Sequence, residues 1–93
     1  MTEEPFHLVW TPTSRRALTR LPEEVASAVI ELCYGPLAGN PRRLGKALKL
    51  ALEGLQSARR GDYRVIYRVN EAEHHVEIVA IEHRADAYRQ RRR

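Results

Sequence analysis

Arginine side chains along residues 57–69 are the first candidates for chemistry in this 93-residue chain. The segment reads SARRGDYRVIYRV, in which Tyr and Val alternate on one face while Arg64, Ile66 and Arg68 share the other. A period of two with β-branched and aromatic residues predicts a strand, and Gly61 followed by Asp predicts a tight hairpin turn before it. A guanidinium group is planar, stays charged and can donate two parallel hydrogen bonds to a phosphate. We therefore expect the strand to present its arginine face to RNA.

Composition predicts a single folded domain over residues 1–93 with a polyanionic partner. Hydrophobic residues make up 43% of the chain and charged residues 30%, as in globular proteins. The formal charge of +4 is unevenly spread, because residues 40–69 and 84–93 are basic, whereas residues 70–83 contain four glutamates and no lysine or arginine. Two basic segments flanking an acidic one favour binding to a nucleic acid.

The elements that position these arginines can be read from periodicity and from helix and turn signals. Thr11-Pro12 predicts an N-cap and first helical residue, and Pro22 can open a second helix, which Gly35-Pro36 and Gly39-Asn40-Pro41 should end. The predicted elements are a strand at 6–11, helices from 12 and from 22, strands at about 54–60, 62–69 and 75–82, and a short C-terminal helix over RADAYRQRRR. The spacing leaves the state of residues 42–52 open. This order is β-α-α-β-β-β, an α+β fold in which an αα-hairpin covers one face of a curved antiparallel sheet with the last strand inside it.

Other potential sites are read as structural. Cys33 lies in an apolar helical stretch and is expected to be a small buried hydrophobe. His74-His75 has no Cys or carboxylate at metal-ligand spacing, so we expect turn residues and no metal. No cofactor is expected. The absence of a long apolar run and of a signal-peptide pattern favours a cytoplasmic protein.

The order of elements, with GDYRVIYRV followed by VEIVAIEHRADAYR, resembles the RelE toxins of the RelE/ParE superfamily. The resemblance covers nearly the whole chain and is closest to the actinobacterial RelE-like subgroup. It implies the toxin of a type II toxin–antitoxin system, a ribosome-dependent endoribonuclease that cuts mRNA in the A site by metal-free attack of the ribose 2′-hydroxyl. It also implies an inhibitory RelB-type antitoxin, in a heterodimer or heterotetramer able to bind operator DNA.

The same resemblance suggests catalytic roles. Arg64 matches the family's strand arginine and would clamp the phosphate, although the residue could instead be a surface arginine paired with an acid across the sheet. Arg84 would stabilise the phosphate or the leaving group. Tyr88, one helical turn on, could stack on a base, take part in proton transfer, or simply pack the helix on the sheet. His83 could be the acid or base, but it competes with Arg84 because adjacent strand residues point to opposite faces.

Further basic residues are expected to contact RNA or the ribosome. They are Arg59, Arg60, Lys46, Lys49, Arg68 and Arg89. Arg59 and Arg60 are neighbours whose side chains diverge, so one of them could serve only the surface. Better-known RelE proteins carry two lysines on the strand before the turn, but residues 55–58 read LQSA, so the resemblance does not identify the general base.

Two alternatives stay open. ParE-like members share the fold but poison DNA gyrase and lack the nuclease residues, whereas this chain keeps Arg64, Arg84 and Tyr88 together. A non-catalytic nucleic-acid-binding module would need only the basic segments.

Overall fold

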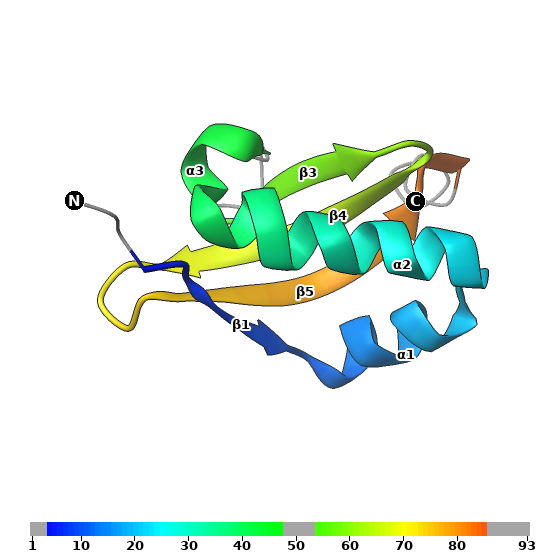
Figure 1. Cartoon of the computed structure of the whole chain (residues 1–93), viewed down its shortest axis with the longest axis horizontal. Helices are drawn as coiled ribbons and strands as arrows, with labels where there is room; N and C mark the ends of the chain where they lie inside the picture. The colour runs from blue at the N-terminus through cyan, green and yellow to red at the C-terminus, as the bar shows by residue number, and fades with distance from the viewer. Residues whose placement is uncertain (1–3, 48–53, 86–93) are drawn as a thin grey trace.

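The computed structural model describes residues 4–47 and 54–85, which form a five-stranded sheet with helices against it (Figure 1). The elements are β1 (His7–Trp10), α1 (Pro12–Arg20), α2 (Glu23–Leu32), η1 (Cys33–Leu37), α3 (Pro41–Leu44), β2 (Lys46–Ala47), β3 (Gln56–Arg60), β4 (Tyr63–Asn70) and β5 (His75–His83). The predicted α+β class and the β-α-α-β-β-β order are confirmed, with two short additions, α3 and β2, in the stretch whose state was open. The predicted C-terminal helix lies largely outside the described residues.

The sheet has the strand order β1-β5-β4-β3-β2, and its β3-β4-β5 part is the predicted antiparallel meander. The interior position predicted for the last strand is confirmed, since β5 lies between β1 and β4. The expectation of a wholly antiparallel sheet is wrong at one pair, because β1 runs parallel to β5, from His7 opposite His75 to Trp10 opposite Ile78. This direction carries the chain from β1 straight into α1, which packs along the following part of β5. The alternation within a four-residue strand contains no information about direction.

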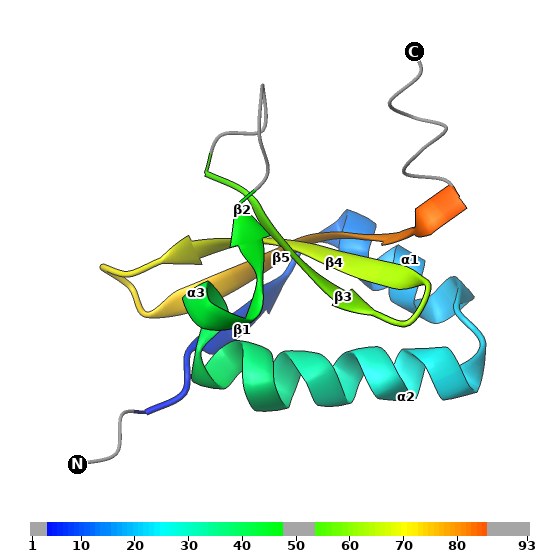
Figure 2. The same ribbon diagram turned by 90° about the horizontal axis from the view of Figure 1, so that it is seen from above.

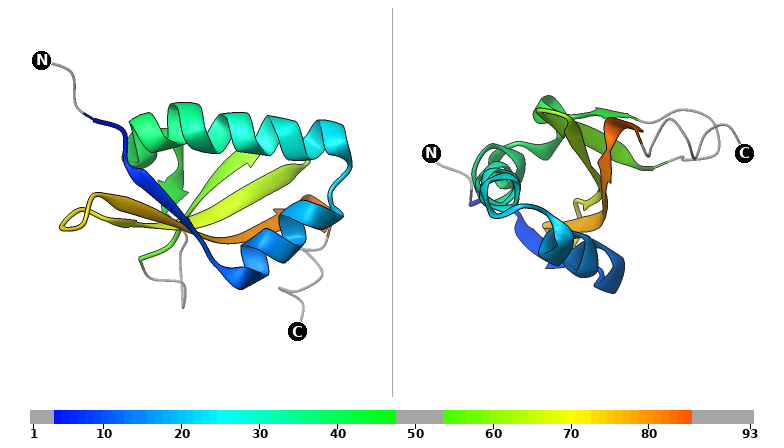
Figure 3. Two further views of the ribbon diagram at one scale, coloured as in Figure 1. Left: turned by 60° about the horizontal axis from the view of Figure 1, so that its bottom comes forward. Right: turned by 90° about the vertical axis from the view of Figure 1, so that its right-hand side faces the viewer.

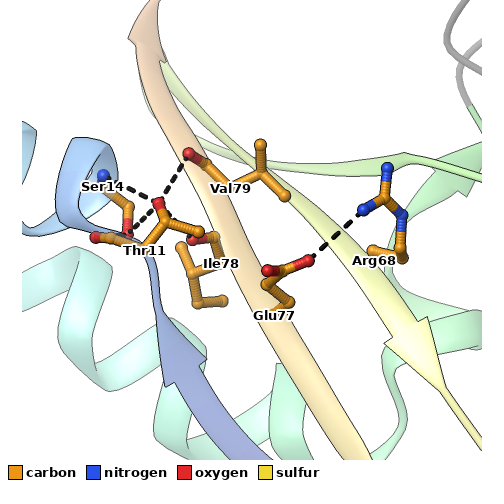
Figure 4. Close-up of polar contacts among 6 residues, drawn as sticks. All are labelled: Thr11, Ser14, Arg68, Glu77, Ile78 and Val79. Atoms are coloured by element: carbon orange, nitrogen blue, oxygen red, sulfur yellow. Dashed lines mark hydrogen bonds and ion pairs between the residues drawn. The ribbon is translucent and has the colours of Figure 1, made fainter.

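The helix starts follow the predicted signals. Thr11 caps α1, its Oγ1 accepting from the Ser14 N–H at 3.1 Å, with Pro12 in the first helical position. Thr11 Oγ1 also lies 3.1 Å from the carbonyl oxygens of Ile78 and Val79, so its single O–H attaches the helix start to β5 (Figure 4).

Of the two stop signals predicted for the second helix, Gly35-Pro36 is wrong and Gly39-Asn40-Pro41 is confirmed, because helical structure continues to Gly39. The helix continues past Leu32 as the π-helical turn η1, with Pro36 inside it. Proline has no N–H for an i→i−4 bond and its ring crowds the preceding turn. The wider π-helical turn tolerates the missing N–H and the bulk of the ring. In this turn the Ala38 N–H reaches back five residues to the Cys33 carbonyl. The chain then turns at Asn40, whose Oδ1 accepts from the Arg43 N–H at 3.3 Å and caps α3.

Helices α1 and α2 lie on the same side of the sheet, which curls around α2 (Figures 2 and 3). The buried cluster between the helical layer and the sheet consists of Val29, Cys33, Leu37, Ala58, Val65, Tyr67, Val76 and Ile78. Cys33 is fully buried, as expected, and its burial raises the pKa of the thiol from 9.0 to about 12, so it remains a neutral core residue. In the described part of the chain, no helix has the length and apolar character needed to cross a membrane.

Candidate functional site

The face of the sheet opposite the helices carries the arginine side of β4. Val65 and Tyr67 are buried beneath the helices, so the alternate residues Arg64, Ile66 and Arg68 lie on the opposite face, which the helices leave uncovered although Ile66 itself is only 7% exposed. The strand registers extend this face in rows. Arg64 is opposite Arg59 of β3 on one side and Glu82 of β5 on the other. The sequence-based expectation that Arg64 avoids the helix-covered face therefore agrees with the register.

Arg64 lies at the centre of this row and is half-buried, its side chain 23% exposed. Its Nη2 is 3.4 Å from Glu82 Oε1, and the Glu82 side chain is 17% exposed. The cross-strand acid that sequence reasoning offered as an alternative is thus present, but it engages only one nitrogen of a group with five N–H donors. The Arg64 Nε is buried and has no hydrogen-bond partner among residues 4–47 and 54–85. An unsatisfied buried donor is costly, so a further acceptor such as a phosphate oxygen would be favoured here once the side chain adjusts.

The neighbouring Arg59 adds a second positive charge to the row. Its Nε donates to the carbonyl oxygen of Gly61 at 3.3 Å, which holds the side chain over the β3–β4 turn. Two like charges directly opposite each other on adjacent strands repel, and the Glu82 carboxylate offsets part of this repulsion. The row therefore has a net positive charge even with its acid in place.

Arg84 is attached to the same turn through its backbone. Its N–H donates to the Asp62 carbonyl oxygen at 2.8 Å, and its Nη1 lies 3.7 Å from Asp62 Oδ1. Both side chains are largely exposed, at 69% and 64%. The β3–β4 turn thus places Arg84 and Arg64 at the same end of the β4–β5 ladder, and each faces a carboxylate that a phosphate would have to replace or share.

His83 occupies the other face. It is opposite Tyr63 in the register and packs edge-on against that ring, with centroids 4.9 Å apart and an interplanar angle of 85°. Its Nδ1 accepts from the Ala85 N–H at 3.1 Å. Arg60 is also opposite Tyr63 and shares this row. The structure therefore separates His83 and Arg60 from Arg64 and Arg59 by strand alternation, as expected for neighbouring residues.

The remaining predicted contacts spread over the uncovered face. Arg68 is opposite Glu77, with its Nη1 3.4 Å from Glu77 Oε1 (Figure 4). Lys46 is exposed on β2, in register with Ser57 and through it with Ile66 on the uncovered face. Three further predicted residues, Tyr88, Lys49 and Arg89, lie outside the described residues.

Two carboxylates of this site, Glu82 and Asp62, were not singled out from the sequence. A signal existed for Asp62, because it lies in the turn itself. None was sufficient for Glu82, since its place opposite Arg64 depends on the extra residue Val79 in β5, which has no partner in the β4 register. The turn position expected for His74-His75 is confirmed for His74, whereas His75 is the first residue of β5. His74 lies in the β4–β5 turn and stacks on Phe6, and no cluster of potential metal ligands occurs within residues 4–47 and 54–85.

Comparison with known proteins gives one consistent family. Residues 8–88 match the family model of the ParE toxin of type II toxin–antitoxin system, parDE. The toxin RelE of Mycobacterium tuberculosis is 52% identical over 87 residues, which cover 94% of this chain and 90% of that protein. The toxin RelG of the same organism is 44% identical over 85 residues, covering 91% and 98% of the two chains. The RelBE2 toxin–antitoxin complex from that organism contains a chain 43% identical with a TM-score of 0.83, covering 88% of this chain and 94% of its own. The chain therefore belongs to the RelE/ParE family of toxins of type II toxin–antitoxin systems.

Proposed function

We propose that this toxin is a ribosome-dependent endoribonuclease that cuts mRNA in the ribosomal A site by metal-free attack of the ribose 2′-hydroxyl on the adjacent phosphate. The observation that carries the proposal is Arg64, which is half-buried on the uncovered face and whose buried Nε lacks an acceptor in the part of the chain that the structure describes. A RelE-family chain that kept only the fold would not need a guanidinium in this position.

The arginines supply the largest catalytic contribution expected for this reaction. Attack of the 2′-oxygen produces a phosphorane that carries more negative charge than the starting diester. Fixed cations stabilise this charge more than they stabilise the substrate, which lowers the barrier. Arg64 binds the phosphate in this scheme, and Arg84, at the same turn, neutralises the phosphate or the leaving oxygen. His83 and Tyr88 remain candidates for proton transfer or base stacking.

The surrounding cations orient the message and the ribosomal RNA. Arg59 and Arg68 belong to the uncovered face in the strand register, and Lys46 is exposed beside it. Together with Arg60, Lys49 and Arg89 they provide backbone contacts whose strength falls as salt rises, because phosphate binding releases counterions.

A RelB-type antitoxin is the proposed regulatory partner. The 43%-identical relative of known structure is part of a toxin–antitoxin complex, which supports this assignment. In the proposal the complex is a heterodimer or heterotetramer that binds operator DNA, and the free toxin acts on cytoplasmic ribosomes.

The test is expression of the toxin without a partner, combined with primer extension on a translated message. The wild-type chain should arrest growth and cut mRNA at A-site codons, and Arg64→Ala with Arg84→Ala should relieve both effects. Loss of one charge-stabilising donor typically costs about 10²–10³-fold in rate. The matched control is Arg15→Ala with Arg16→Ala, which removes two exposed arginines from α1 and should leave cleavage unchanged.

Two results would contradict the proposal. Broken DNA with intact mRNA would instead indicate gyrase poisoning, the activity of ParE-like toxins. Equal toxicity of the Arg64/Arg84 double variant and the wild type would show that the cleavage chemistry lies elsewhere.

A further inference from the structure

The uncovered face contains a carboxylate next to the proposed phosphate clamp, and no role above uses it. Glu82 Oε1 is 3.4 Å from Arg64 Nη2, and the two residues are direct partners in the β4–β5 register. The Glu82 side chain is 17% exposed, so it is held by the sheet yet still reaches the surface. We propose that Glu82 is the general base that removes the proton from the 2′-hydroxyl, an inference that rests on the proposed nuclease function.

The distance to Arg64 puts this carboxylate within reach of the nucleophile. A guanidinium that binds a non-bridging oxygen fixes the phosphorus, and the 2′-oxygen in a reactive conformation lies about 3–3.5 Å from that phosphorus. A general base must be within hydrogen-bond reach of the hydroxyl that it deprotonates. Because Glu82 touches the same guanidinium, one arrangement of the ribose satisfies both conditions.

Other proton acceptors in the described part of the chain fit less well. His83 is on the opposite face, against Tyr63. Asp62 is 64% exposed on the turn and faces Arg84. Glu77 is on the same face of β5, but it is opposite Arg68, whose side chain is 53% exposed, and it lies toward the other end of the strand.

The proposed step balances without a further reactant. The Glu82 carboxylate takes the 2′-O–H proton as the 2′-oxygen forms its bond to phosphorus. The bond from phosphorus to the 5′-oxygen breaks, and that oxygen takes a proton from water. The products are a 2′,3′-cyclic phosphate and a 5′-hydroxyl, and Glu82 returns its proton to the solvent. Arg64 binds the phosphorane throughout, so the Arg64–Glu82 pair supplies both charge stabilisation and proton transfer.

The decisive variant is Glu82→Gln, which keeps the size of the side chain but removes its basicity. In single-turnover cleavage of mRNA on programmed ribosomes with saturating toxin, its rate should fall by about 10²–10⁴-fold. Its affinity for the ribosome should change less than threefold. The wild-type rate should rise with pH and then level off, and the variant should lose this rising limb.

The chain offers a matched control in Glu77→Gln. Glu77 also lies on β5, also faces an arginine at 3.4 Å, and should be replaceable without loss of rate or change in pH profile. Glu82→Asp keeps the charge but shortens the side chain by one methylene, so it should retain an intermediate rate with the rising limb intact. If Glu82→Gln proves too unstable to assay, the rate and pH profile of Glu82→Asp still test whether Glu82 is the general base.

Several outcomes would overturn the assignment while leaving the nuclease function standing. These are a Glu82→Gln rate within threefold of wild type, a rate above wild type, or a slow variant with the wild-type pH profile. A faster variant would show that the carboxylate competes with the phosphate for Arg64, and an unchanged pH profile would show that it only positions Arg64. Intact mRNA with the wild-type toxin would refute the nuclease function and this proposal with it.

Discussion

Replacing Gly45 with alanine should be among the most destabilising single-methyl additions in this chain. Gly45 lies between α3 and β2, and a Cβ built on it would overlap Tyr67 Oη and lie 2.8 Å from the Ser57 carbonyl oxygen. Neither neighbour can easily move. Tyr67 is fully buried and donates its hydroxyl to the Pro41 carbonyl oxygen, and Ser57 is backbone-paired with β2.

The size of the effect follows from these contacts. Overpacking a filled core costs about 1–3 kcal/mol. Displacing the tyrosine hydroxyl leaves the buried Pro41 carbonyl without its donor, which adds a similar cost and gives about 2–6 kcal/mol in all. A domain of this size has a total stability of roughly 5–14 kcal/mol, so the variant should lose at least about a seventh of it and, at the upper end of the range, most of it. The substitution should also disturb β2, because this strand begins with Lys46 directly after Gly45.

Urea unfolding followed by fluorescence measures the effect. The control is Gly39→Ala, because a Cβ at Gly39 meets nothing within 4 Å. In the double variant Gly45→Ala with Tyr67→Phe, the overlap with the tyrosine hydroxyl disappears. The stability lost by the double variant should therefore be smaller than the sum of the two single losses by about 1 kcal/mol or more. A Gly45→Ala variant as stable as Gly39→Ala would refute this description of the packing around Tyr67.

Three further predictions concern the core, the α1 start and the proposed phosphate clamp. Burial raises the pKa of Cys33 from 9.0 to about 12 and that of Tyr67 from 10.0 to about 12, so above pH 9 the unfolded chain loses these protons first. The free energy of unfolding should therefore fall between pH 9 and 12, by up to about 1.4 kcal/mol per pH unit for each group, and Cys33→Ala should make the fall shallower. Thr11→Val removes the cap of α1 and its bond to β5 and should cost about 1–2 kcal/mol in thermal or urea unfolding, whereas Thr13→Val, at an exposed helix position, should cost clearly less. Arg64→Lys keeps the charge but loses the planar fork, so cleavage on ribosomes should fall by roughly 10²-fold, while stability changes by less than about 1 kcal/mol.

Local signals in the sequence were sufficient for most of the fold. Alternation predicted a strand at 62–69, close to the observed Tyr63–Asn70, and the capping pair Thr11-Pro12 predicted the start of α1. These features depend on neighbouring residues, so they can be read without knowing the tertiary structure. The uncovered position of Arg64 followed in the same way, because the apolar side of β4 had to face the core.

Features set by distant contacts could not be read locally. Pro36 is an ordinary helix terminator, and only the packing of Cys33 and Leu37 into the core explains why the chain continues as a π-helical turn. In residues 42–52, leucine spacing favoured a helix and Gly45 opposed it. The structure divides the described part of that segment between α3 and β2, and β2 is two residues long and is held by its pairing with β3.

The position of Glu82 shows how one extra residue can decide what a site contains. In β5 the core residues Ile78 and Ile81 are three apart, which a regular strand cannot place on one face. Val79 makes this possible because it is an extra, bulged residue of β5. Ile66 pairs with Ala80 and Tyr67 pairs with Ile78, so Val79 has no partner in β4. Without this bulge, every later residue of β5 would change face. Glu82 would then point toward the helices and would no longer lie beside Arg64.

The same bulge explains why Thr11 is relevant to the site although it lies at the opposite edge of the sheet. The Thr11 backbone N–H donates to the Ile78 carbonyl oxygen at 3.2 Å, and its hydroxyl reaches the carbonyls of Ile78 and Val79 (Figure 4). A bulge leaves ladder groups without strand partners, so these bonds stabilise the irregular geometry and the register beyond it. The start of α1 therefore helps to determine which carboxylate faces Arg64.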